Sequence, residues 1–145
     1  YTDLALARDS VRRRWPVAEV VETCATGGRP DMALSVLGLL AGYEDAPVWI
    51  AENKVVARIL HASESWTIEG AEGKTFSIIA IAPNNVVSEH GLEWELDRSL
   101  LGLLADTGIS NVVRSTAKIE VHTGTAIAYL LRDGSIGMVG EQENP

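Results

Sequence analysis

Residues 65–81 read SWTIEGAEGKTFSIIAI, which is two β-rich runs joined by a loop that contains glycine. This arrangement predicts a β-hairpin with a longer connecting loop. The second run, residues 75–81, is apolar almost without interruption, as is typical of a central strand that is buried on both faces. Proline and asparagine at residues 83–85 end it. The second half of the chain is therefore expected to be built on a sheet.

The remainder of the second half predicts one long helix and three further strands. The helix is expected over residues 89–105, because its leucines fall on one face at helical spacing; they are Leu92, Leu96, Leu100, Leu103 and Leu104. A strand is expected over 111–121. Residues 126–131 and 136–139 predict a hairpin that turns at Asp133-Gly134, since this dipeptide between apolar runs is a strong hairpin signal.

The first half predicts helices over residues 3–15, 17–26 and 31–43. The second and third of these would form an αα-hairpin whose turn contains Gly27, Gly28 and Pro30. Residues 48–62 fit either a helix or a strand followed by a helix, and a helix over 50–62 is favoured. The expected fold is α+β, with three or four helices followed by the order β-β-α-β-β-β. It would be a mostly antiparallel sheet with one long covering helix.

Length and composition favour one domain over residues 1–145. It would consist of a helical part (1–62), a sheet-rich part (63–140) and a frayed tail (141–145). A chain of 145 residues with 46% hydrophobic residues can bury a sufficient core without a disulfide or a metal. One cysteine, no signal peptide and no apolar run of about 20 residues favour a cytoplasmic protein that does not cross a membrane. No motif indicates a cofactor or a metal.

The net charge of −8 disfavours contact with a phosphate backbone, so nucleic acid is an unlikely partner. A local exception lies near the N-terminus, where Arg12, Arg13 and Arg14 are consecutive. Together with Arg29, which precedes the third expected helix, they are the candidate anion contacts. Nucleic-acid contact through residues 12–14 is kept as a weaker alternative, and a solvated helix face explains the same residues.

One candidate polar site is the face formed by His90, Glu93 and Asp97. Their spacing of three and four residues would place them on one side of the expected helix. A histidine with two carboxylates can bind a divalent cation or transfer protons. Acidic residues in a first helical turn are also expected from the helix dipole alone, which is the structural interpretation of the same pattern.

Apolar residues provide the more general signal. The helix expected over residues 31–43 is apolar nearly all round, which indicates a core helix or one that is covered by a partner. Trp15, Trp49, Leu37 and Leu40 are the candidate interface residues. The sequence therefore favours a non-catalytic protein-interaction, regulatory or assembly domain that binds another protein or itself. The alternative is a small enzyme or ligand-binding domain that uses the His90, Glu93 and Asp97 face.

Overall fold

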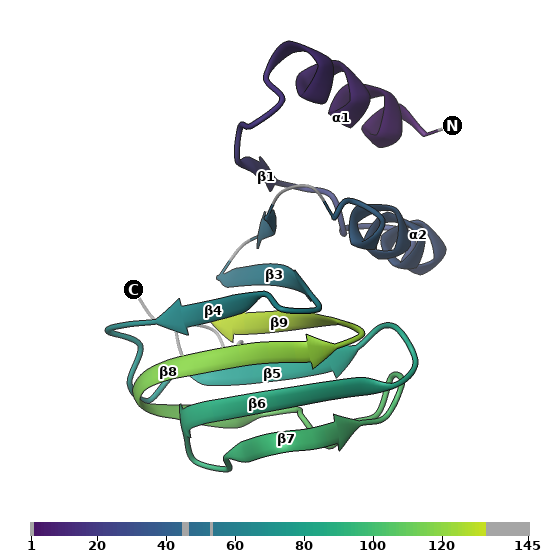
Figure 1. The fold of residues 1–145 in the computed structure, drawn as a ribbon. Coiled ribbons are helices and arrows are strands. Elements are labelled where there is room, and N and C mark those ends of the chain that lie inside the picture. Colours follow the sequence, from purple (N-terminus) through teal and green to yellow (C-terminus); the bar gives the residue numbers. More distant parts are fainter. Residues whose placement is uncertain (1, 45–46, 53, 133–145) are drawn as a thin grey trace, which may run out of the picture.

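The computed structural model of the protein describes residues 2–44, 47–52 and 54–132. These residues form two helices and nine strands (Figure 1). In chain order they are α1 (Asp3–Arg14), β1 (Val20–Glu22), α2 (Pro30–Ala41), β2 (Val48–Glu52), β3 (Val55–His61), β4 (Ser65–Ile68), β5 (Thr75–Ala80), β6 (Asn85–Leu92), β7 (Leu96–Leu101), β8 (Asn111–Thr123) and β9 (Thr125–Leu131).

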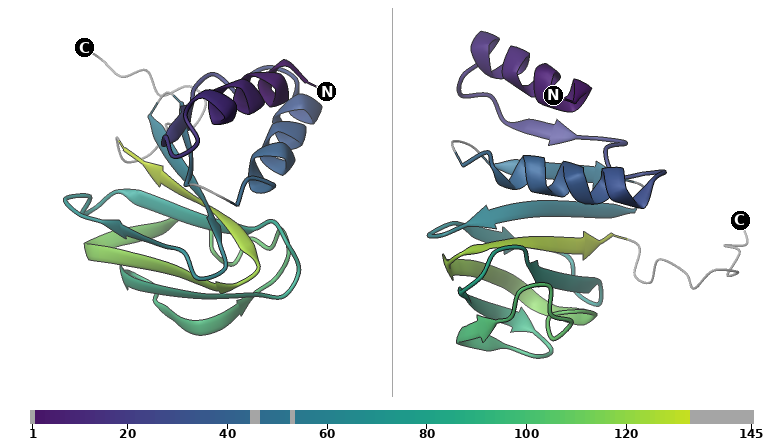
Figure 2. Two further views of the ribbon diagram at one scale, coloured as in Figure 1. Left: turned by 45° about the horizontal axis from the view of Figure 1, so that its top comes forward. Right: turned by 90° about the vertical axis from the view of Figure 1, so that its right-hand side faces the viewer.

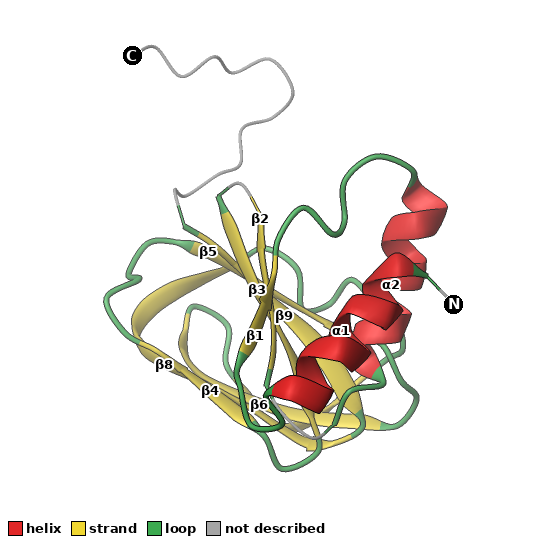
Figure 3. Ribbon diagram, turned by 90° about the horizontal axis from the view of Figure 1, so that it is seen from above, coloured by secondary structure: helices red, strands yellow, loops and turns green. Residues whose placement is uncertain are grey.

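The strands form two layers that share strand β8. The strand order is β1-β2-β3-β9-β5-β8-β6-β7, and β4 also pairs with β8. The first two residues of β8 pair with β5 in the first layer, whereas residues 113–123 pair with β4 and β6 in the second. The result is a β-sandwich in which both helices lie on the same side of the strands (Figure 3). Figure 2 shows the helices at one end of the molecule and the β6–β7 hairpin at the other.

Strand β5 is buried on both of its faces. Phe76, Ile78 and Ala80 belong to the core between the two layers, and Ile79 packs in a second cluster beneath α2. A strand that is covered on both sides needs apolar residues at consecutive positions. The prediction of a central strand from the run 75–81 is therefore confirmed by its pairing with both β8 and β9.

The first half contains a parallel β-α-β unit. Val20 of β1 pairs with Val48 of β2 in parallel, and α2 connects the two strands. Helix α1 is fixed against this unit by Arg8, whose guanidinium lies 2.6 Å from the Glu22 carboxylate and 4.2 Å from the centre of the Tyr43 ring. Since Arg8 and Glu22 are both buried, breaking one side of the pair would leave an uncompensated charge.

The predicted α+β class with a helical first half is wrong. The helix predicted over 3–15 ends one residue earlier, and the one predicted over 31–43 spans Pro30–Ala41, but residues 17–26 contain strand β1, so no αα-hairpin forms. Residues 50–62 belong mainly to strands β2 and β3. Both strands pack apolar residues on both faces. In a short run that is apolar on both faces, the spacing of apolar residues does not distinguish a strand from a helix.

The predicted covering helix over residues 89–105 is also wrong, because these residues form most of the β6–β7 hairpin. A helix would also allow Leu92 and Leu96 to contact the core, as they do. The predicted helix would place Leu100 on the same face, but Leu100 is 81% exposed. Gly91 has φ +82°, and a Cβ there would lie 2.3 Å from the Thr116 carbonyl oxygen of β8. Only glycine fits this close approach. The strand predicted over 136–139, its turn and the tail lie outside the described residues.

We expect Gly91→Ala to lower the free energy of unfolding by more than about 2 kcal/mol, because the new methyl group meets the β8 backbone and the backbone is left-handed. Gly38→Ala is the matched control. Gly38 lies inside α2 with open space around its Cα, so alanine should raise stability by about 0.5–1 kcal/mol. Urea unfolding of both variants measures the difference. Equal stabilities would show that β6 does not approach β8 in this way.

Candidate functional site

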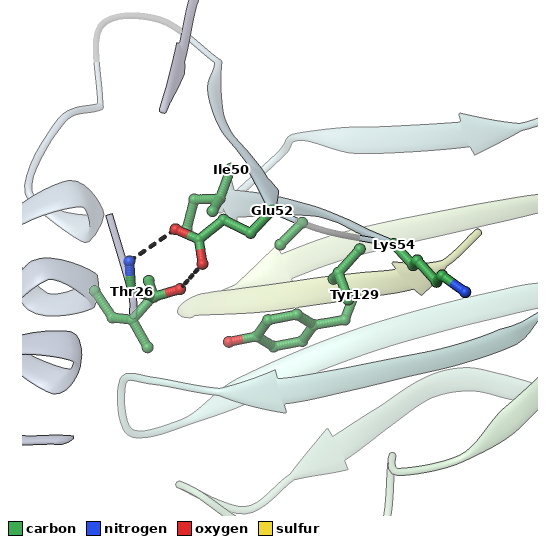
Figure 4. A pocket seen from close by; sticks show the side chains of 8 residues that line it. Thr26, Ile50, Glu52, Lys54 and Tyr129 are labelled. Carbon is green, nitrogen blue, oxygen red and sulfur yellow. Dashed lines mark hydrogen bonds between the residues drawn. The ribbon is translucent and has the colours of Figure 1, made fainter. Parts of the chain in front are cut away.

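A cavity lies between α2 and the outer face of the first layer (Figure 4). Its volume is about 540 Å³, and its walls are mainly apolar. The residues that line it are Thr26, Leu37, Ile50, Glu52, Lys54, Val55, Ala57 and Tyr129. Because β1 and β2 run in parallel, the C-terminal end of β2 meets the loop that follows β1 at the edge of this cavity.

Glu52 holds that loop in place. One carboxylate oxygen accepts hydrogen bonds from the amides of Ala25 (2.5 Å) and Thr26 (2.7 Å), and the other accepts the Thr26 hydroxyl. Burial alone would raise the pKa of Glu52, but these donors outweigh burial and hold the pKa below its usual value. A fixed negative charge therefore stands at the mouth of the cavity.

Tyr129 supplies a neutral polar group beside that charge. Burial raises the pKa of the Tyr129 phenol, and the nearby Glu52 carboxylate raises it further. The phenol therefore keeps its proton and can donate a hydrogen bond. Figure 4 shows the Tyr129 ring inside the cavity, whereas the Lys54 amine points away from Glu52. Such a cavity suits a ligand with an apolar body and a donor or a positive charge at one end.

A second feature is the turn between β6 and β7, which exposes an aromatic ring on a fixed backbone. Trp94 is 63% exposed. Its amide donates to the Asn111 side-chain oxygen (3.1 Å), and its carbonyl accepts from the Asn111 side-chain nitrogen (2.7 Å). The neighbouring Glu93 amide donates to the Val112 carbonyl (2.8 Å). The indole is thus presented to solvent by a turn that β8 holds on both sides.

Glu89 lies behind this turn and is 1% exposed. Burial raises the pKa of its carboxyl to about 7, and the nearby Asn111 side chain partly opposes that rise. The Oε1 atom of Glu89 is buried and has no hydrogen-bond partner. A buried carboxyl with half of its hydrogen-bonding capacity unused is costly and uncommon in a sandwich core.

The structure does not bring the predicted polar face together. His90 lies in β6, Glu93 in the turn and Asp97 in β7, and all three are exposed. The Glu93 carboxylate pairs with Arg114 instead, and His90 lies 3.8 Å from Glu95. No group of three or more potential metal ligands occurs within residues 2–44, 47–52 and 54–132.

Three of the four predicted anion contacts, Arg12, Arg14 and Arg29, have partners within the chain. Arg12 donates to the carbonyls of Pro16 (3.0 Å) and Ala18 (3.2 Å). Arg13 is exposed, and Arg14 stacks on the Trp15 ring at 5.0 Å. Arg29 pairs with Asp31 at 2.5 Å directly before α2, and it does not line the cavity.

The predicted interface residues occupy different environments. Leu40 is wholly buried and Leu37 lines the cavity, so both make contacts within the chain. Trp49 is half-buried and packs edge-on against Trp66 with ring centres 5.3 Å apart. Trp15 is 53% exposed.

The sequence analysis did not single out Glu52, Tyr129, Glu89, Asn111 or Trp94 as functional residues. For Glu52, the end of a possible strand at residue 52 was the only available signal. For Trp94, the signal was an aromatic residue between two glutamates at a point that proved to be a turn.

Residues 63–127 match the family model for the vitamin B1 binding domain of thiamin pyrophosphokinase. The fold is also similar to solved thiamin pyrophosphokinases. The Bacillus subtilis protein superposes with a TM-score of 0.78 at 20% identity, over 92% of this chain and 64% of that one. The Geobacillus thermodenitrificans protein has a TM-score of 0.78 at 22% identity, over 92% of this chain and 63% of that one. The Candida albicans protein has a TM-score of 0.67 at 14% identity, over 90% of this chain and 52% of that one. A search of curated proteins gives no significant match.

These identities establish likeness of fold, and the chain spans less than two thirds of each of these three proteins. The expectation of a non-catalytic regulatory or assembly domain is wrong, because the sheet-rich part matches the ligand-binding domain of a kinase and the whole chain resembles such enzymes. The alternative of an enzyme or ligand-binding domain is favoured instead.

As for the expected absence of a membrane span, no helix among the described residues is long and apolar enough to cross a bilayer.

We expect Glu52→Gln to reduce the hydrogen-exchange protection of the Ala25 and Thr26 amides about 10- to 100-fold, since a charge-assisted acceptor is lost. In the unsubstituted protein the folded-state pKa of Glu52 is lowered. The stability that the ionised carboxylate contributes is therefore fully present above the unfolded-state pKa. The contribution should disappear only as the pH falls through the lower folded-state value.

The control is Glu69→Gln, because Glu69 is exposed and lies away from the loop. Hydrogen exchange measured by mass spectrometry should show unchanged protection at residues 25 and 26 in this variant. Equal loss of protection in both variants would mean that the Glu52 carboxylate does not fix the loop.

Proposed function

We propose that this chain provides the thiamin-recognising part of a thiamin pyrophosphokinase, an enzyme that by its name transfers pyrophosphate to thiamin. The observation that carries the proposal is the match of residues 63–127 to a vitamin B1 binding domain. That segment begins just after β3, extends into β9 and so includes the second layer of the sandwich. It also contains the Trp94 turn, Asn111 and Glu89.

The chemistry of the Trp94 turn fits the proposed ligand. Thiamin carries a planar, permanently cationic thiazolium ring beside an aminopyrimidine. A tryptophan face attracts such a cation by about 0.5–2 kcal/mol. Because Asn111 fixes the Trp94 backbone on both sides, little further ordering is needed when a flat ring stacks there.

The loop before α2 fits the anionic part of the reaction. Helix α2 begins at Pro30, and no side chain caps its N-terminus. Gly28 has φ +80°, and the exposed Arg29 stands directly before the helix. The positive end of the α2 dipole favours a phosphate group. We assign contact with the transferred pyrophosphate to this loop, in which Arg29 pairs with Asp31 and Glu52 holds Ala25 and Thr26.

Self-association is part of the same proposal. The β6–β7 hairpin and the α2 end of the chain lie at opposite ends of the molecule (Figure 1). One copy does not bring the Trp94 turn and the loop before α2 to the same ligand, whereas two copies can. Light scattering of the purified chain measures the oligomeric state directly.

A reducing, cytoplasmic location is likewise proposed, and the free, exposed Cys24 is compatible with it.

We expect the purified chain to bind thiamin in isothermal titration calorimetry, and Trp94→Leu to weaken that binding about 3- to 30-fold through loss of the cation–aromatic contact. Trp15→Leu is the matched control, since Trp15 is similarly exposed but lies at the end of α1 outside the matched segment. Its affinity should stay within about twofold of the unsubstituted protein. Absence of thiamin binding by the unsubstituted chain, or equal losses in the two variants, would contradict the proposal.

A further inference from the structure

We infer that two copies of this chain associate through an apolar groove between α2 and the segment that connects β7 to β8, with Leu104 of each copy inserted into the groove of the other. The inference names a surface for the self-association, and in that respect it rests on the proposed function. It can be measured on the purified chain without thiamin or any other ligand.

The groove lies on the outer face of the first layer. Ile79 of β5 and Ile127 of β9 are paired at its floor. Leu34 of α2 stands on one side, and Leu103 and Leu104 of the β7–β8 connection stand on the other. The volume is about 340 Å³, so the groove can admit a leucine side chain.

The rim of the groove is apolar and open to solvent. Leu34 is 66% exposed, Leu103 is 54% exposed and Leu104 is 65% exposed. Among the described residues, those that line the groove include no charged side chain. Three leucines exposed to this extent form a patch on the order of a few hundred Å², and contiguous apolar patches of that size mark binding sites on soluble proteins.

Leu104 is held in a backbone conformation that leucine rarely adopts. Its φ is +53°, in the left-handed region that is uncommon for residues with a Cβ. The Leu104 amide donates to the Ala80 carbonyl (2.9 Å), and Leu103 forms a bridge with Ala80, so β5 fixes the connection in this conformation. Because most of the Leu104 side chain is in solvent, contacts within the chain do not offset the backbone strain. A partner that buries the side chain would offset it.

A second copy of the chain is the occupant that shape favours. A two-fold dimer joins the same surface of both copies, so that surface must be complementary to itself. The ridge formed by Leu103 and Leu104 lies directly beside the groove. A two-fold axis along their border therefore places the ridge of each copy in the groove of the other.

Area and charge agree with this occupant. A standard interface buries about 800 Å² on each partner and is a little over half apolar, so the exposed leucines supply a large part of the apolar area that a dimer needs. The net charge of −8 makes two copies repel one another. An uncharged apolar surface is the most favourable place for them to meet.

The same contact would complete the cavity that Glu52 borders. Leu37 and Tyr129 line both the groove and that cavity, so the two spaces adjoin. A leucine of the second copy in the groove covers the cavity on the side where they adjoin. Association would therefore add a wall to the cavity without any change within the first copy.

Analytical ultracentrifugation of the unliganded chain tests the inference. The unsubstituted chain should sediment as a dimer, and added salt should tighten the dimer because it screens the repulsion between the copies. Leu104→Gly removes the side chain and suits the left-handed backbone. It should keep the free energy of unfolding of dilute protein close to that of the unsubstituted chain. It should also raise the dimer dissociation constant roughly 100-fold or more, since each dimer loses two buried leucines.

A pair of charged variants tests the reciprocal contact. Leu34→Lys and Leu104→Glu should each be monomeric, because each places an unpaired charge in an apolar interface. An equal mixture of the two should form a mixed dimer, in which the introduced lysine of one copy faces the introduced glutamate of the other. Native mass spectrometry of the mixture measures this product.

Val17→Glu is the control, because Val17 is 95% exposed but does not line the groove. Its dimer dissociation constant should stay within about twofold of the unsubstituted value. A monomeric unsubstituted chain, a dimer that survives Leu104→Gly, or an equal loss of association in Val17→Glu would each overturn the inference. A monomer that carries the mass of an apolar small molecule would also overturn it, since a ligand would then occupy the groove. If Leu104→Glu does not fold, Leu104→Gly decides.

The result is separable from the proposed function. A chain that binds thiamin but is monomeric, or whose dimer is insensitive to the groove variants, keeps thiamin recognition and loses this inference. A chain whose dimer depends on Leu34 and Leu104 but that does not bind thiamin does the reverse.

Discussion

The continuous strand β8 is the constraint on which both layers of this protein depend. Its first two residues complete the first layer beside β5, and the remaining residues form the centre of the second layer between β4 and β6. A single strand that serves two layers fixes their relative register, because a slip of one residue would turn its inward side chains outward in both. Asn111 lies at the start of this strand, where the layers part, and from there it reaches the Trp94 turn.

Burial on both faces of the first layer explains where the polar groups of interest lie. The sandwich core covers one face and α2 covers much of the other, so a polar side chain on these strands is removed from water. Glu52 and Tyr129 lie at the edge of the helix-covered face, and Glu89 lies within the core. In such surroundings a charge is either held by donors, as at Glu52, or suppressed by a raised pKa, as at Glu89.

The likeness to thiamin pyrophosphokinases changes the interpretation of the exposed apolar groups. The expectation of a protein-interaction domain rested on Trp15, Trp49, Leu37 and Leu40, whereas the structure exposes Trp94 and the apolar side chains of the β7–β8 connection. Because Trp94 lies within the segment that matches a vitamin B1 binding domain, we propose its exposed ring as a ligand contact. The Trp94 turn and the loop before α2 lie at opposite ends of the molecule, so the proposal requires two copies of the chain to bring them to one ligand.

The sequence by itself determined the elements whose signal is local. The helices near residues 3–14 and 30–41, the strands near 65–68, 75–80 and 111–123, and the start of the second helix at Pro30 follow from capping residues, alternation and apolar runs. Only the tertiary structure decided the rest. Residues 89–105 have leucines at helical spacing, but the close approach of Gly91 to β8 makes them a hairpin. The contacts of Glu52 with Thr26 and of Trp94 with Asn111 join residues that are 26 and 17 positions apart. Chain folding alone creates such contacts, and no periodicity along the sequence encodes them.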